Sequence, residues 1–78
     1  MTQAERFRRA HEDAPVVCRH RYPQELEMMR ERIRAWRLKT GDDIVTAALA
    51  IEARELRSFR RRVALAAAVD MLAEEAQP

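Results

Sequence analysis

The stretch DDIVTAALAIEARELRSFRRRVALAAAVDMLAEEAQ, residues 42–77, contains no Gly and no Pro. Such a run predicts a single long helix, because Gly and Pro are the residues that most often interrupt one. From Val63 to Ala73 the run is apolar on nearly every side, with Asp70 as its only charge. A helix that is apolar all round needs neighbours on all sides. The stretch therefore predicts an all-α protein whose long helix is covered by other helices or by a partner.

The chain has 78 residues, 15 basic and 13 acidic side chains, and a net charge of +2. This length has room for a single domain, residues 1–78, with one small core. Cys18 is the only cysteine, so no intrachain disulfide can form, and oligomerisation is the usual support that remains for so short a chain. No apolar stretch is long enough to predict a membrane span or a signal peptide. We therefore expect a cytoplasmic protein.

A second helix is predicted over residues 24–40. Its acidic residues lie near the start and its basic residues near the end, as the helix dipole favours. Gly41 is a typical C-terminal stop, and Asp42 or Asp43 then caps the next helix. Apolar residues at coiled-coil spacing form one face of this helix: Leu26, Met29, Ile33 and Trp36.

These two helices should fold back on each other as a long antiparallel helical hairpin over residues 23–77, because only two or three residues connect them. Trp36 should then be largely buried against Val45 or Leu49 on the longer helix. The shorter helix cannot reach the second half of the longer one. A second apolar stripe appears there, formed by Leu65, Val69 and Leu72.

We expect this second stripe to bind a partner, either another copy of the chain in a dimeric helical bundle or a different protein. The alternative is that residues 1–22 fold back over the stripe. These residues form an N-terminal arm, with a capping box at Thr2 and Glu5 that predicts a short helix. Residues 16–22 are rich in β-branched and aromatic side chains and precede a proline, which predicts an extended linker or a strand.

Three arginines of the long predicted helix, Arg54, Arg57 and Arg61, share one face. Such a face could contact an acidic protein surface or the phosphates of a nucleic acid. The alternative is a solvated face with ion pairs to neighbouring glutamates.

Candidates for chemistry are few. Cys18, His11 and His20 are the only residues that suggest a metal site, and they lack both the number and the spacing of structural zinc ligands. No third residue is placed to orient a Cys–His pair for catalysis, and no Gly-rich loop is present to hold a phosphate. We expect no enzyme activity, no metal and no cofactor.

Residues 16–49 resemble the ribbon-helix-helix repressors in three segments: VCRHR (17–21), YPQEL (22–26) and IVTAAL (44–49). The resemblance implies that two chains pair their strands and that alternate side chains enter the DNA major groove. Those contacts would be Val17, Arg19 and Arg21, or else the side chains on the opposite face of the strand. The chain departs from that family in its first helix. There it places Arg30, Arg34 and Arg37 where the family has apolar core residues.

We therefore expect a small non-enzymatic regulatory or adaptor protein that binds a protein partner through a helical surface. The partner-binding residues would be Leu65, Val69, Leu72, Arg54, Arg57 and Arg61. The alternative function is a DNA-binding transcriptional repressor of the ribbon-helix-helix type. The expected partners are a second copy of the chain, a different protein, or both, and nucleic acid stays possible.

Overall fold

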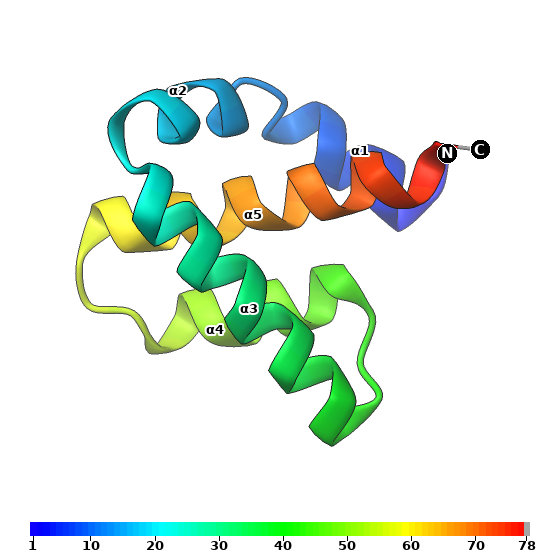
Figure 1. The fold of residues 1–78 in the computed structure, drawn as a ribbon. Coiled ribbons are helices and arrows are strands. Elements are labelled where there is room, and N and C mark those ends of the chain that lie inside the picture. Colours follow the sequence, from blue (N-terminus) through cyan, green and yellow to red (C-terminus); the bar gives the residue numbers. More distant parts are fainter. Residues whose placement is uncertain (78) are drawn as a thin grey trace.

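The computed structural model describes residues 1–77 and shows an all-α protein, as the sequence predicted (Figure 1). Within these residues there is no strand. The helices are α1 (Gln3–Ala10), α2 (Ala14–Arg21), α3 (Pro23–Thr40), α4 (Ile44–Arg54) and α5 (Ser58–Ala76).

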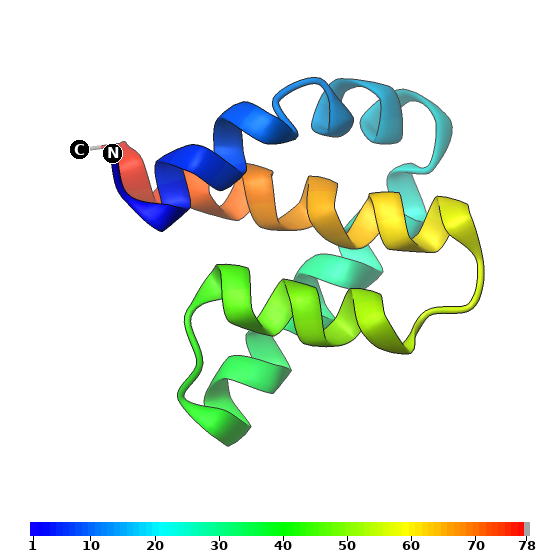
Figure 2. The same ribbon diagram turned by 180° about the vertical axis from the view of Figure 1, so that it is seen from behind.

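Helix α5 lies in the middle of the molecule. Helices α1 and α2 run along one side of it and α4 runs antiparallel to it on the other, while α3 crosses at an angle (Figures 1 and 2). The four alanines of its central turns have no exposed surface, since small side chains let neighbouring helices approach closely: Ala64, Ala66, Ala67 and Ala68. The all-round apolar pattern of this helix is thus met by neighbours from its own chain.

The prediction of one long helix over residues 42–77 is wrong. Glu55 and Arg57 adopt extended backbone angles, with φ −85° and ψ 133° at Glu55, and separate α4 from α5. Two side-chain contacts hold this turn: Arg32 of α3 pairs with the carboxylate of Glu55, and Arg61 donates to its backbone carbonyl at 2.8 Å. Because of this break, α5 folds back along α4, and the antiparallel neighbours are α4 and α5.

The prediction of an extended segment over residues 16–22 is also wrong, because α2 runs through it. Pro15 stands in the first turn of this helix, where a missing backbone N–H costs nothing. Cys18 is buried against the core, and that tertiary contact outweighs the weak strand preference of the two valines before it. The restriction imposed by Pro23 falls on Tyr22 alone, whose backbone angles of φ −135° and ψ 54° are not helical.

Helix α3 matches its prediction, since Leu26, Met29 and Ile33 are buried and Gly41 ends the helix at φ +78°. Trp36, however, is only partly buried. Its indole Nε1 donates to Asp42 at 2.9 Å, and the Arg54 guanidinium lies 4.7 Å from the ring centroid. Trp36 thus packs against the core, as expected, but Asp42 and Arg54 provide polar contacts at its exposed part.

No helix among residues 1–77 is both long and apolar enough to cross a membrane.

Candidate functional site

Charged residues at the ends of α5 have the opposite arrangement from those of α1 and α3. Helices α1 and α3 carry an acidic residue in the first turn and basic residues in the last, which the helix dipole favours. Helix α5 has no acidic residue in its first turn and no basic residue in its last. Arginines stand at its start and Glu74 and Glu75 at its end. Both sets are placed where the dipole disfavours them.

At the C-terminal end of α5, neighbouring helices compensate this charge. Glu74 accepts a hydrogen bond from Arg30 of α3, and Glu75 pairs with Arg37 of the same helix at 3.3 Å. One turn earlier, Asp70 binds Arg19 of α2 at 2.9 Å. The Arg30 side chain is only 13% exposed, whereas the Glu74 side chain is 55% exposed, so water and salt screen this pair in part. This ion-pair network ties α2 and α3 to α5.

The N-terminal end of α5 has no such compensation. Arg57 is the N-cap residue, and its side chain makes no capping hydrogen bond. Arg60 lies over the Phe59 ring, with the guanidinium 5.9 Å from the ring centroid. Arg61 bonds to the backbone of the turn. Throughout residues 1–77, no arginine of this group makes an ion pair with an acidic side chain.

The connection between α2 and α3 lies at the same end of the molecule (Figure 1). The rings of Tyr22 and Phe59 stack there, with centroids 4.9 Å apart. Arg21 and Arg62 line one shared cavity beside this stack. We call this surface the arginine corner, and its members are Arg21, Leu56, Arg57, Arg60, Arg61 and Arg62.

Leu56 is the apolar residue of the arginine corner. It lies on the α4–α5 turn and is 90% exposed. An extended backbone on both sides holds its side chain away from the core. Single exposed apolar side chains are common on protein surfaces. Leu56 differs because Arg57 follows it directly and the run Arg60–Arg62 begins four residues later, and none of these arginines makes an ion pair within residues 1–77. An exposed apolar residue next to charged ones is the composition of an interface with an apolar centre and a charged rim.

A cavity of about 200 Å³ lies next to the corner, between α2 and α5. Ala14, Val17, Cys18 and Tyr22 form its mainly apolar part, and Asp13, Arg21 and Arg62 its charged part. Burial raises the pKa of the Cys18 thiol, while the nearby positive charge of Arg62 acts in the opposite direction. The thiol is therefore held in its neutral form, which is the poorer nucleophile.

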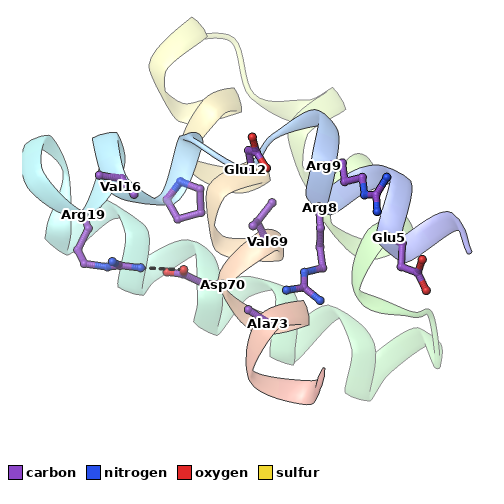
Figure 3. A pocket seen from close by; sticks show the side chains of 10 residues that line it. Glu5, Arg8, Arg9, Glu12, Val16, Arg19, Val69, Asp70 and Ala73 are labelled. Atoms are coloured by element: carbon purple, nitrogen blue, oxygen red, sulfur yellow. Dashed lines mark hydrogen bonds and ion pairs between the residues drawn. The ribbon is translucent and has the colours of Figure 1, made fainter. Parts of the chain in front are cut away.

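A wider cleft of about 520 Å³ lies between α1, α2 and α5 (Figure 3). Arg8 extends into it from α1, and Arg19 reaches Asp70 from the opposite wall. The floor contains Val69 and Ala73. Basic and acidic side chains are evenly mixed around this cleft, with Arg8, Arg9 and Arg19 beside Glu5, Glu12 and Asp70. The cleft therefore has no net preference for an anion or a cation.

The structure separates the residues that the sequence grouped as partner-binding. Val69 and Leu72 are buried, at 7% and 9% exposure, and Leu65 is partly buried against the core. The N-terminal helices cover this side of α5, so the expectation that the stripe lies open to a partner is wrong. The alternative, in which residues 1–22 fold back over the stripe, matches the structure. The geometric case for a dimer through this stripe is thereby lost.

The predicted arginines also differ from one another. Arg54 lies on Trp36 and donates to the Ala50 carbonyl, so it belongs to a different surface from Arg57. Arg57 and Arg61 lie in the arginine corner. Arg19 is engaged with Asp70, and Arg21 lies on a helix, so the strand needed to present both to DNA is not there. The ribbon-helix-helix alternative is not supported.

Sequence reasoning missed Leu56, Arg60 and Arg62 as site residues. An unbroken helix over residues 42–77 would turn Leu56 toward the core, so the sequence gives no reason to expect it on the surface. The one signal in the sequence is the run of three consecutive arginines at 60–62. In the part of the chain that the structure describes, no three His, Cys, Asp or Glu side chains gather as metal ligands.

Comparison with protein-family models, with curated proteins and with solved structures finds no match for this chain. The site is therefore interpreted from its own geometry.

Proposed function

We propose that this chain is a small non-enzymatic regulatory or adaptor protein that docks its arginine corner onto an acidic surface of a partner protein. The observation that carries the proposal is the uncompensated positive charge at the start of α5. Its arginines lower the stability of the helix, and none finds an acidic side chain among residues 1–77. An acidic partner would supply the missing negative charge.

Two further features support a protein partner. Arginine is enriched in the energetically important parts of protein interfaces, because its planar group forms several hydrogen bonds and stacks on apolar surface. Leu56 provides an exposed apolar contact next to Arg57, which a phosphate backbone would not use.

The test is a capture experiment with the full chain and extract from its source cells. The corner variant carries Arg57→Glu and Arg60→Glu. The control variant carries Arg9→Glu and Arg34→Glu, which changes the net charge equally at two exposed arginines outside the corner that make no ion pair in the described chain. Captured proteins are quantified by mass spectrometry, with and without nuclease treatment.

We expect the corner variant to capture about tenfold less of the acidic partner, or less still, and the control variant to capture as much as wild type. Unfolding cannot explain such a loss, because acidic residues at the start of α5 favour the helix. An equal loss of capture in both variants would mean that the net charge of the chain, and not the arginine corner, determines binding. Capture that depends on the corner but disappears with nuclease would replace the protein partner by a nucleic acid, and either result overturns the proposal.

A further inference from the structure

The cavity between α2 and α5 has the size of one side chain. Its volume of about 200 Å³ is below the range of about 300–1,000 Å³ that is usual for drug-sized ligands and cofactors. Its floor includes Cys18, which is 4% exposed, and its apolar wall includes Val17, which is half-exposed. A cavity with an apolar floor and an open mouth suits a single apolar anchor of a larger partner.

The charges at the mouth indicate what surrounds that anchor. Arg21 and Arg62 both line the cavity, and neither makes a hydrogen bond or an ion pair through its side chain within residues 1–77. Asp13 lines the cavity as well and disfavours an acidic group beside it. Acidic groups next to the anchor would therefore lie on the side of the two arginines.

The cavity lies next to the rest of the arginine corner, because Arg62, which lines the cavity, directly follows Arg60 and Arg61 on α5. A partner segment that crosses the corner with its acidic residues would therefore pass the mouth of the cavity. The stacked rings of Tyr22 and Phe59 lie beside this path and provide an apolar surface for an aromatic group.

We propose that the cavity above Cys18 is an anchor pocket for one aromatic side chain of an acidic partner segment, with Arg21 and Arg62 pairing with the acidic residues next to that side chain. This inference rests on the proposed function, because it names the chemistry of the segment that the arginine corner binds. The segment is a short acidic stretch with a single phenylalanine, tyrosine or tryptophan.

The probe is a capped pentapeptide with two acidic residues on each side of one phenylalanine, compared with the same peptide carrying alanine. Binding is measured by NMR titration of the full chain, following the backbone amides of Ala14 and Cys18. Val17→Trp is designed to fill the pocket from its rim. Val16→Trp is the matched control, because Val16 is the exposed neighbour on the same helix and lines the other cleft.

We expect the phenylalanine peptide to bind about tenfold to a hundredfold more tightly than the alanine peptide, as burial of one large apolar side chain predicts. Val17→Trp should abolish this difference, and Val16→Trp should preserve it. The inference is overturned if the two peptides bind equally, if neither binds, or if Val17→Trp leaves the preference unchanged.

The same titration separates failure of the anchor pocket from failure of the proposed function. Suppose that wild type shows no preference for the phenylalanine peptide, and that the variant with Arg57→Glu and Arg60→Glu binds both peptides more weakly. The anchor pocket would then be disproved, and the arginine corner would still be supported as the docking surface. If these two substitutions do not weaken the binding or its preference for phenylalanine, the anchor pocket is supported and the arginine corner is disproved as the docking surface.

Discussion

The two ends of α5 present the same electrostatic problem with different outcomes. Each end carries charges of the sign that the helix dipole disfavours. At the C-terminal end, Arg30 and Arg37 of α3 reach Glu74 and Glu75, so the unfavourable local placement becomes a set of tertiary contacts. At the N-terminal end, the arginines have no acidic partner within residues 1–77.

At one end of α5, tertiary contacts offset the unfavourable placement of charge in the helix dipole. At the other end they do not. Natural sequences tend to agree with their fold at every level, and disagreement that nothing in the fold compensates is typical of functional sites. The acidic end of α5 is compensated and therefore structural. The basic end is uncompensated, which supports its proposed role in binding.

The largest expected effect comes from breaking the compensated end. Arg30→Ala would remove the ion pair to Glu74 and leave Asp70, a poorly exposed carboxylate, with Arg19 as its only partner. We expect the free energy of unfolding to fall by about 2–3 kcal/mol, because hydrogen bonds to charged groups contribute more than neutral ones. Urea denaturation followed by circular dichroism measures this change.

The control for this variant is Arg34→Ala on the same helix. Arg34 is exposed and makes no ion pair in the described chain, so its replacement should change the unfolding free energy by less than about 0.5 kcal/mol. Equal effects of the two substitutions would mean that the network at the acidic end adds nothing to stability.

Removal of the N-cap of α4 should have a smaller effect on stability. Unlike α5, this helix has a side-chain hydrogen bond at its N-cap. The Asp43 carboxylate accepts a hydrogen bond from the backbone N–H of Thr46 at 2.7 Å. Asp43→Ala should lower the free energy of unfolding at pH 7 by about 1 kcal/mol, whereas Asp43→Asn should change it by only a few tenths. The same denaturation experiment measures both variants.

This contribution should depend on pH in one direction. The hydrogen bond from the Thr46 N–H lowers the pKa of Asp43 below its ordinary value. The cap therefore contributes in full above the unfolded-state pKa of about 3.9, and its contribution is lost as pH falls through the lower folded-state pKa. The stability difference between wild type and Asp43→Ala should narrow below about pH 4. A constant difference down to pH 2 would contradict the role of the carboxylate.

The smallest expected effect is a gain in stability at the uncompensated end. Arg57→Asp would place a capping carboxylate at the start of α5 and remove one disfavoured positive charge. We expect the free energy of unfolding to rise by about 0.5–1 kcal/mol while partner capture falls. If this variant is less stable than wild type, Arg57 has a structural role, and the contrast between the two ends of α5 disappears.

The predictable parts of the fold are those that depend on local signals. The N-cap at Thr2, the apolar face of α3 and the stop at Gly41 all appear in the structure. Each acts through backbone hydrogen bonds or through residues three or four positions apart, so a single helix contains all the information. Of the arginine corner, Arg57 and Arg61 were predicted as partner-binding residues and Arg21 as a nucleic-acid contact.

The sequence by itself determined that the chain is helical and that the helix now seen as α5 must be surrounded. What surrounds it was decided by the tertiary structure. The break at Glu55 depends on Arg32 from another helix, and the helical form of residues 14–21 depends on burial of Cys18 against the core. Such contacts join residues that are far apart in the chain, so no local sequence pattern predicts them. Leu56 and the arginines after α4 become one exposed corner only because the chain turns there.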